Sequence, residues 1–206
     1  MKMPALIVVT DVARYGREQT LDRLRSLLPA AVPGSVMVQL RDRRLPGRER
    51  LALARELRAL TRQHEQYLCI NDRLDLALVV DSDAVHLGEA SVSAEDARAL
   101  VGSRLVITRA CHDPANLSQS SAADAYLLSP VFAERKGNPA LGFDALGRAR
   151  SLLLAHDPRQ ALYALGGVDA AAAERCAQLG VGVAVIGAVF TVAEPSGLLA
   201  ALGIRR

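Results

Sequence analysis

Charged and amide side chains follow several short apolar runs of this sequence, and their types suit a phosphorylated ligand. Arg41 and Arg43 follow one run, and Asn71 and Asp72 follow the next. Arginine binds phosphate oxygens, and a carboxylate can hold a Mg2+ ion that shares those oxygens. The residues that close the runs are Asp11; Gln39, Arg41 and Arg43; Asn71 and Asp72; His86 and Glu89; Arg109 and His112; Ser129 and Lys136; Gly166 and Gly167; and Gly187.

Eight aliphatic runs must position these residues. They predict strands over residues 5–10, 35–40, 67–70, 84–87, 105–107, 125–131, 161–165 and 183–186. Helix-like segments lie between most of them, and Ser93 and Asp169 are candidate helix caps. Eight strand-then-helix units predict an α/β fold, a (β/α)8 TIM barrel, as a single domain over residues 1–206.

The C-terminal ends of barrel strands meet at one mouth, so this fold would gather the polar residues around a single site. A doubly wound open sheet is the structural rival. It would place a glycine-rich phosphate turn after the first strand, and residues 10–13 are not such a turn. The glycines that end the last two runs suit the phosphate site that barrels often build there.

Composition narrows the class of protein. Of 206 residues, 50% are hydrophobic but only 3% are aromatic, which favours an aliphatic core. The net charge of +3 comes from 25 basic and 22 acidic residues, a mixed surface with few aromatic platforms, so a nucleic-acid partner is disfavoured. Three widely spaced cysteines indicate reduced thiols. The apolar run near the N-terminus is too short for a signal peptide or a membrane span, which predicts a cytoplasmic protein.

Several of these residues also have a purely structural explanation. Gly166-Gly167 can form a tight turn, and Asn71-Asp72 can cap a helix. Arg41 and Arg43 can be surface arginines with solvated heads. Both kinds of explanation stay open at this point.

The histidines and the loop lysine have two explanations each. His86 lies inside an apolar run and is typical of a satisfied core histidine. His112 lies at a strand tip, where it could transfer a proton. Its neighbour Cys111 would point to the other side of the strand, which argues against a Cys-His nucleophilic pair. Lys136 could be only a solvated loop cation.

Six motifs in order resemble the thiamine phosphate synthase/TenI family over about residues 5–190. They are Val38-Gln39-Leu40-Arg41-Asp42-Arg43, Ile70-Asn71-Asp72-Arg73-Leu74-Asp75-Leu76-Ala77, Val85-His86-Leu87-Gly88, Ala110-Cys111-His112, Ser129-Pro130-Val131-Phe132 and Ala164-Leu165-Gly166-Gly167-Val168. The resemblance implies one of two chemistries. A synthase joins hydroxymethylpyrimidine pyrophosphate to thiazole phosphate and releases pyrophosphate, whereas the TenI branch isomerises a thiazole carboxylate phosphate.

The resemblance also implies roles for individual residues. For the synthase, the substrate-binding residues would be Gln39, Arg41, Arg43, Asn71, Arg109, Lys136, Gly166, Gly167, Gly187 and Ala188. Asp72 would hold Mg2+, with Glu89 as a replacement second ligand. The catalytic residues would be Arg41 and Lys136 at the leaving group and, in the TenI branch, His112 as the proton-transfer group.

The chain departs from the synthase pattern at four places. Arg43 stands where the family has a lysine, and Ser91 stands at the second magnesium aspartate. Ala110 replaces a serine, and the Thr-x-Thr-Lys loop is reduced to residues 134–136. These changes weaken the expected pyrophosphate site more than the thiazole phosphate site.

Three functions are therefore weighed. A synthase is favoured because Arg41, Asn71, Asp72 and Lys136 are retained. A TenI-type tautomerase that uses His112 and a diverged, non-catalytic binder of phosphate ligands are the alternatives. The partners expected are small phosphorylated substrates, without nucleic acid or membrane. The oligomeric state stays open, with a homodimer as one option, as does closure of loop 133–142 over substrate.

Overall fold

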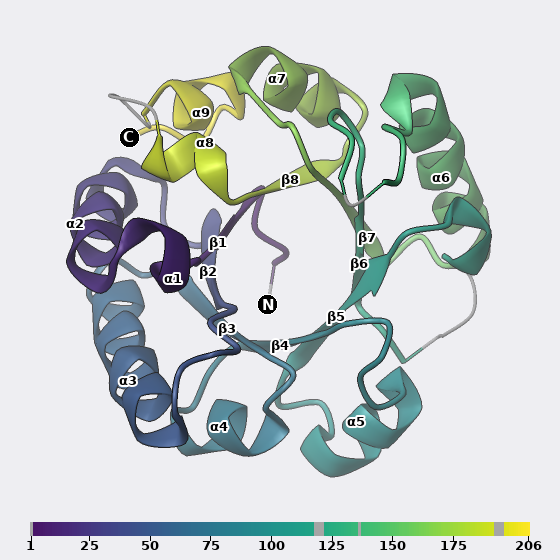
Figure 1. The fold of residues 1–206 in the computed structure, drawn as a ribbon. Helices are drawn as coiled ribbons and strands as arrows, with labels where there is room; N and C mark the ends of the chain where they lie inside the picture. Colours follow the sequence, from purple (N-terminus) through teal and green to yellow (C-terminus); the bar gives the residue numbers. More distant parts are fainter. Residues whose placement is uncertain (1, 118–121, 136, 192–195) are drawn as a thin grey trace.

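Eight parallel strands form a closed barrel in which each strand pairs with its neighbours in sequence and β8 pairs with β1 (Figure 1). The structure is a computed structural model that describes residues 2–117, 122–135, 137–191 and 196–206. The strands are β1 (Leu6–Val9), β2 (Val36–Leu40), β3 (Tyr67–Asn71), β4 (Ala84–Leu87), β5 (Val106–Cys111), β6 (Ala125–Leu128), β7 (Ala161–Leu165) and β8 (Gly182–Val185). The predicted (β/α)8 barrel is confirmed.

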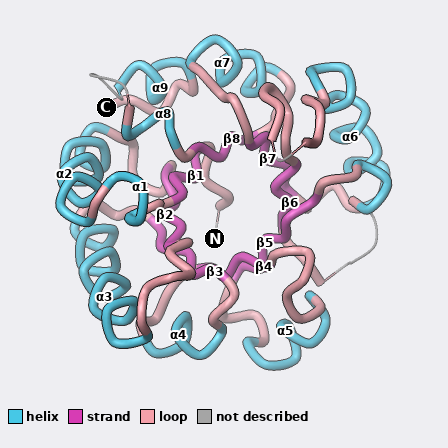
Figure 2. Tube along the Cα trace, viewed as in Figure 1, coloured by secondary structure: helices cyan, strands magenta, loops and turns pink. Residues whose placement is uncertain are grey.

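Helices surround the barrel as an outer ring (Figure 2). They are α1 (Val12–Tyr15), α2 (Arg17–Leu27), α3 (Gly47–Gln63), α4 (Leu74–Val79), α5 (Ala94–Val101), α6 (Gly142–His156), α7 (Ala170–Gln178), α8 (Gly187–Phe190) and α9 (Ser196–Ala201), with short 3-10 turns at Leu28–Ala30 and Pro114–Asn116. The predicted caps are confirmed, because Ser93 accepts from the Asp96 N–H and Asp169 accepts from the Ala172 N–H. No described helix is long and apolar enough to cross a membrane.

Side chains of the strands alternate between two cores. Outward residues such as Val8 and Val38 pack under the helices, and inward residues such as Ile7 and Met37 fill the barrel. Since successive residues of a strand face opposite sides, the inward row of each strand ends at the mouth. The strand register therefore decides which polar residue reaches the site.

The opposite end of the barrel is closed by the N-terminal segment and by an ion pair between Arg58 and Asp83. The Tyr163 hydroxyl donates to the Pro4 carbonyl at 2.6 Å, and Met3 packs against the inner core. At the start of β4, Asp83 accepts from Arg58 Nη1 and from the Leu68 N–H, both at 2.7 Å. These contacts stabilise the scaffold and lie away from the mouth.

Replacing Asp83 with alanine is expected to lower the free energy of unfolding by about 2 to 3 kcal/mol, because it removes the carboxylate partner of the nearly buried Arg58 and the acceptor of a strand N–H. Urea unfolding measures this change. Asp22→Ala is the matched control, since its ion pair with Arg25 is exposed and should change stability by less than about 0.5 kcal/mol. Equal losses in the two variants would contradict the expectation.

One strand differs from the prediction in a way that matters for the site. The sequence predicts a strand over 105–107, whereas β5 continues to Cys111. Arg109 therefore lies inside the strand rather than at its tip. It pairs in register with Leu87 and Tyr126, which both belong to the outer core, so it occupies an outward position.

Candidate active site

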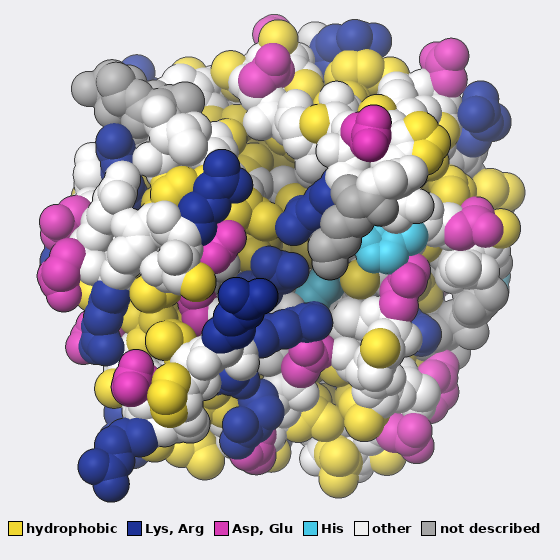
Figure 3. Space-filling view, in the orientation of Figure 1, with side chains coloured by type: hydrophobic (Ala, Val, Ile, Leu, Met, Phe, Trp, Pro, Cys, Tyr) yellow, Lys and Arg dark blue, Asp and Glu magenta, His cyan; other side chains and the backbone are white. Residues whose placement is uncertain are grey.

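Two adjoining cavities open at the C-terminal ends of the strands. The larger is about 580 Å³ and the smaller about 310 Å³. Both are lined by Arg135, Leu165 and Ile186, so they share a wall. Figure 3 shows basic side chains gathered around this hollow, over an apolar floor. The barrel thus brings residues from nearly the whole chain to one mouth.

The amides of β2 and β3 form part of the larger cavity. Gln39 and Asn71 occupy inward positions at the ends of their strands, and Gln39 Nε2 donates to Asn71 Oδ1 at 3.1 Å. Gln39 is only 2% exposed, yet its Oε1 has no hydrogen-bond partner among the described residues. A buried acceptor without a partner is costly, so a ligand N–H group that reached this oxygen would be bound favourably.

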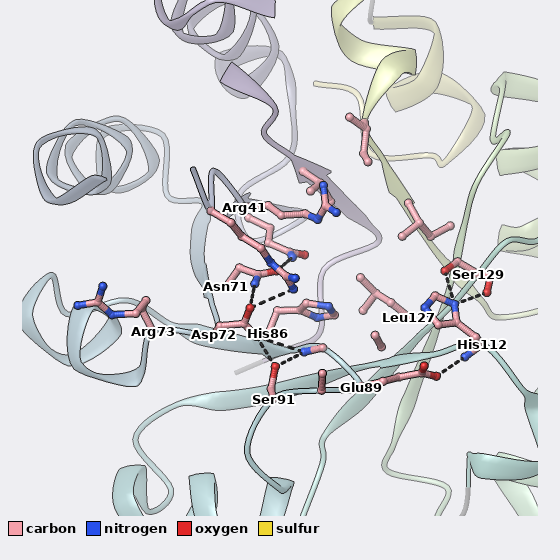
Figure 4. Close-up of a pocket in the computed structure, with 18 of the residues that line it drawn as sticks. Arg41, Asn71, Asp72, Arg73, His86, Glu89, Ser91, His112, Leu127 and Ser129 are labelled. Atoms are coloured by element: carbon pink, nitrogen blue, oxygen red, sulfur yellow. Dashed lines mark hydrogen bonds and ion pairs between the residues drawn. The ribbon is translucent and has the colours of Figure 1, made fainter. Parts of the chain in front are cut away.

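The Asp72 carboxylate accepts from several donors at once (Figure 4). Oδ2 accepts from Asn71 Nδ2 at 2.7 Å and pairs with Arg43 Nη2 at 3.0 Å. Oδ1 accepts from the Ser91 hydroxyl and from the Gly88 N–H, the latter at 3.3 Å. Asp72 has a φ of +62°, so its backbone occupies the left-handed region that a non-glycine residue rarely adopts. These contacts hold it in that conformation.

Among the described residues, the arginines that line the two cavities are Arg14, Arg41, Arg43, Arg73 and Arg135, and three of them crowd together from two loops. Arg41 and Arg43 come from the end of β2, and Arg135 comes from the loop after β6. Burial, and next the charges of Arg135 and Arg43, lower the pKa of Arg41. Among the described residues, neither Arg41 nor Arg135 forms an ion pair with a carboxylate, whereas Arg43 pairs with Asp72. Guanidiniums that crowd together are suited to bind a multiply charged anion.

His86 lies on the floor of the larger cavity and is held by a neighbour. Its Nδ1 lies 2.9 Å from the Thr108 hydroxyl, and the ring is buried. Burial, the largest effect, lowers the pKa of His86 to about 4, and Arg43 and Arg41 act in the same direction against Asp72. The ring is therefore neutral near pH 7. The sequence-based interpretation of a satisfied histidine is confirmed, although the residue also lines the cavity.

Stability should fall as the pH drops from about 6.5 to about 4. In this window His86 binds a proton in the unfolded chain but not in the folded chain. Proton binding therefore stabilises the unfolded state and lowers the free energy of unfolding, by roughly 3 kcal/mol over the whole window. His86→Asn should remove this part of the pH dependence. Urea unfolding at several pH values measures the difference between the two proteins. Parallel pH profiles would contradict the low pKa.

His112 stands at the far side of the larger cavity, directly after β5. Its Nδ1 lies 2.7 Å from the Ser129 carbonyl oxygen and 3.1 Å from the Ser129 hydroxyl. A carbonyl only accepts, so Nδ1 carries a proton, and in the neutral form of the ring the lone pair is on Nε2. The His112 N–H donates to Glu89 Oε1 at 3.1 Å (Figure 4). Cys111 packs in the outer core, as the alternation along the strand predicts.

The smaller cavity lies beside β7, β8 and α8. It is lined by the predicted phosphate-binding residues Gly166, Gly167, Gly187 and Ala188, and also by Asp11, Arg14, Ala133, Glu134, Val168, Ala184 and Val185. At Gly167, φ is +71° and a Cβ would lie 2.6 Å from the Ala133 Cβ. Glycine is thus required there by close packing as well as by conformation.

One predicted site residue, Arg109, is not part of this arrangement. Arg109 is absent from the described lining of both cavities, and its outward position on β5 explains why. Its predicted binding role finds no support in the geometry. Lys136 lies outside the described residues. Glu89 lines the larger cavity, and no group of three or more His, Cys, Asp or Glu residues that could hold a metal ion occurs in the described part of the chain.

Some site residues were missed by reasoning from the sequence. Arg135 is next to the predicted Lys136, so a search for any cation in that loop would have found it. From the sequence, Ser91 only marks the loss of a metal-binding aspartate. No sequence pattern indicates its hydrogen bond to Asp72. Arg14 lies on the four-residue helix α1, which carries no clear periodicity.

Comparison with known proteins identifies the family. A family model described as thiamine monophosphate synthase matches residues 6–189. A thiamine-phosphate synthase of Methanoculleus marisnigri is 37% identical over 89% of this chain and 86% of its own length. One of Thermosynechococcus vestitus is 34% identical over 84% of this chain but only 50% of its own.

A solved structure supports the same relationship. The thiamine phosphate pyrophosphorylase of Pyrococcus furiosus superposes with a TM-score of 0.81 at 26% identity, over 96% of this chain and 95% of that one. This chain spans about half the length of several curated relatives that it matches. The family model and the full-length relative agree, and the chain belongs to the thiamine monophosphate synthase family.

Proposed function

We propose that this chain joins hydroxymethylpyrimidine pyrophosphate to thiazole phosphate, forming thiamine phosphate and releasing pyrophosphate. The observation that carries the proposal is the pair of adjoining cavities with a shared wall at Arg135, Leu165 and Ile186. Two substrates that must react with each other need separate binding sites whose reactive ends meet. The names of the relatives point to the same reaction.

The larger cavity suits the pyrimidine substrate. Gln39 and Asn71 present amide groups to the ring, and Gln39 Oε1 is an acceptor without a described partner. Arg41, Arg43 and Arg135 line this cavity and would hold the diphosphate. Lys136 is proposed to assist at the leaving group, as the family resemblance implies.

The smaller cavity suits the phosphate of the thiazole substrate. Gly166, Gly167 and Gly187 line this cavity and carry no side chains of their own, so their N–H groups would be the ones to approach phosphate oxygens. Arg14 and Arg135 add positive charge to the same cavity, against the carboxylate of Asp11. A phosphate anchored here would direct the thiazole ring toward the shared wall.

Catalysis of this reaction then depends mainly on electrostatic stabilisation of the charges that develop. The bond between the pyrimidine methylene carbon and the diphosphate oxygen breaks, the electron pair leaves with pyrophosphate, and the arginines stabilise the developing negative charge. The thiazole nitrogen lone pair forms the new C–N bond. His86 stays neutral near the pyrimidine, so it does not repel the cation that forms. No proton transfer by a side chain is required.

The magnesium ion that the resemblance implies does not fit Asp72 as it is arranged. Four donors already engage the two carboxylate oxygens, and one of them is the Arg43 guanidinium. Mg2+ needs free oxygen ligands and close to octahedral geometry. The arginines, with Lys136 at the leaving group, would carry the steps described above.

Incubation of the protein with both substrates tests the proposal. Thiamine phosphate and pyrophosphate are expected in equal amounts, with and without Mg2+ in the buffer. An active synthase assayed in parallel with Mg2+ is the control for substrate quality. If that control forms product and this protein forms none in either buffer, the proposal fails.

A tautomerase acting on thiazole carboxylate phosphate is the second candidate, and the tautomer of His112 favours it. With Nδ1 donating to the Ser129 carbonyl, Nε2 can accept a proton from a ligand carbon and return it elsewhere. The thiazole phosphate would use the same glycine-lined cavity. Apart from His112, the larger cavity and its arginines have no evident use in that reaction, which is why the synthase is preferred.

A further inference from the structure

We propose that Arg43, together with Arg41 and Arg135, takes the place of a divalent cation, so that this chain binds the diphosphate of its substrate without a metal ion. The inference rests on the proposed function and specifies how its larger cavity works. It starts from the two positions where this sequence departs from the family around Asp72, namely Arg43 and Ser91.

The first support is the occupation of Asp72. A carboxylate has about four lone-pair directions, and here an amide, a guanidinium, a hydroxyl and a backbone N–H engage them. Ser91 supplies a donor to Asp72, where a second carboxylate would supply a ligand to an ion. The Asp72 carboxylate therefore accepts hydrogen bonds from these donors and holds the Arg43 guanidinium.

The second support is the position of the Arg43 head. Its Nη2 lies 3.0 Å from Asp72 Oδ2 and would lie 3.1 Å from a Cβ at Gly88, so the guanidinium sits between the β3 and β4 loops. The Arg43 side chain is 55% exposed, and the residue lines the larger cavity, so its remaining N–H groups can reach a ligand. A fixed guanidinium that keeps free donors can bind a diphosphate as a metal ion would.

The third support is the charge of the neighbours. Arg41 and Arg135 are close enough to each other to affect the pKa of Arg41, and neither has a carboxylate partner among the described residues. Among the described residues, four guanidiniums (Arg41, Arg43, Arg73 and Arg135) and three carboxylates (Asp72, Asp75 and Glu89) line the larger cavity, so it keeps a net positive charge. A divalent cation would be repelled there, whereas a diphosphate anion would be attracted.

Calorimetric titration of the full chain with inorganic pyrophosphate tests the inference. Binding in EDTA is expected to be at least as tight as binding in Mg2+. Arg43→Gln should weaken binding in EDTA by about 10-fold or more, because a charged hydrogen-bond donor is lost. Arg44→Ala is the control, because it removes the same charge from an exposed neighbour that is not among the described residues lining either cavity. It should change the affinity for pyrophosphate by less than about twofold.

A second variant makes the test reciprocal. Arg43→Lys combined with Ser91→Asp frees the Asp72 carboxylate and adds another, so pyrophosphate binding should become tighter with Mg2+ by about 10-fold. Circular dichroism checks that this variant is folded. A folded variant that stays indifferent to Mg2+ would overturn the inference, because Arg43 and Ser91 would not be what excludes the ion.

The outcomes separate this inference from the proposed function. Wild-type binding of pyrophosphate that requires Mg2+ would overturn the inference and leave the synthase reaction in place. Absence of pyrophosphate binding in both buffers would remove the synthase proposal itself, since pyrophosphate is its product.

Discussion

Replacing Arg41 with alanine is expected to lower kcat/KM for the joining reaction by about 100- to 1,000-fold. Arg41 lies half-buried at the end of β2, where its backbone N–H donates to the Thr10 hydroxyl at 3.1 Å. That contact fixes the start of the side chain, and the guanidinium lines the cavity beside Arg43 and Arg135. Charge that develops on departing pyrophosphate would lose its most enclosed donor.

The conservative variant separates charge from shape. Arg41→Lys keeps the positive charge but loses the planar fork of donors, so it should recover only part of the lost rate. Arg44→Ala, on the same loop, should stay within about twofold of the wild-type rate. Release of pyrophosphate followed over time measures all three variants. An Arg41→Ala protein with an unchanged kcat/KM would exclude this arginine from the reaction.

The barrel could be predicted because its signals are local and repeated. Strands buried on both faces read as aliphatic runs, and two of them, β4 and β7, have the predicted bounds. The ends of the strands were harder to predict, because a polar residue that faces the barrel interior interrupts the apolar run although the strand continues. Thr108 in β5 is such a residue, facing His86, and it led to the wrong end for that strand.

Placement of the site residues followed from the fold, but their contacts did not. Gln39, Asn71 and His112 line one cavity because each is at or just beyond an inward strand end. The pairing of Asp72 with Ser91 crosses 19 residues and depends on the shape of two loops, which no sequence period encodes. The sequence shows Arg43 only as a replacement for a lysine. Its ion pair with Asp72 could be found only from the structure.

His112→Ala is expected to separate the two candidate reactions. If the protein isomerises thiazole carboxylate phosphate, the variant should lose that activity by about 100- to 10,000-fold, because Nε2 is the proton carrier and Nδ1 is fixed by Ser129. The joining reaction needs no proton at this position and should change only a few-fold. Assays of both reactions on the same preparation give the comparison.

The control for this variant is His156→Ala, at the exposed end of α6, which should affect neither reaction. An unchanged isomerisation in His112→Ala would remove His112 from proton transfer. Loss of both reactions together would instead indicate a role in binding the thiazole phosphate that they share. His112 and Arg41 line the same cavity, so their positions alone do not separate their roles. The two variants differ because His112 can transfer a proton, whereas Arg41 can only stabilise negative charge.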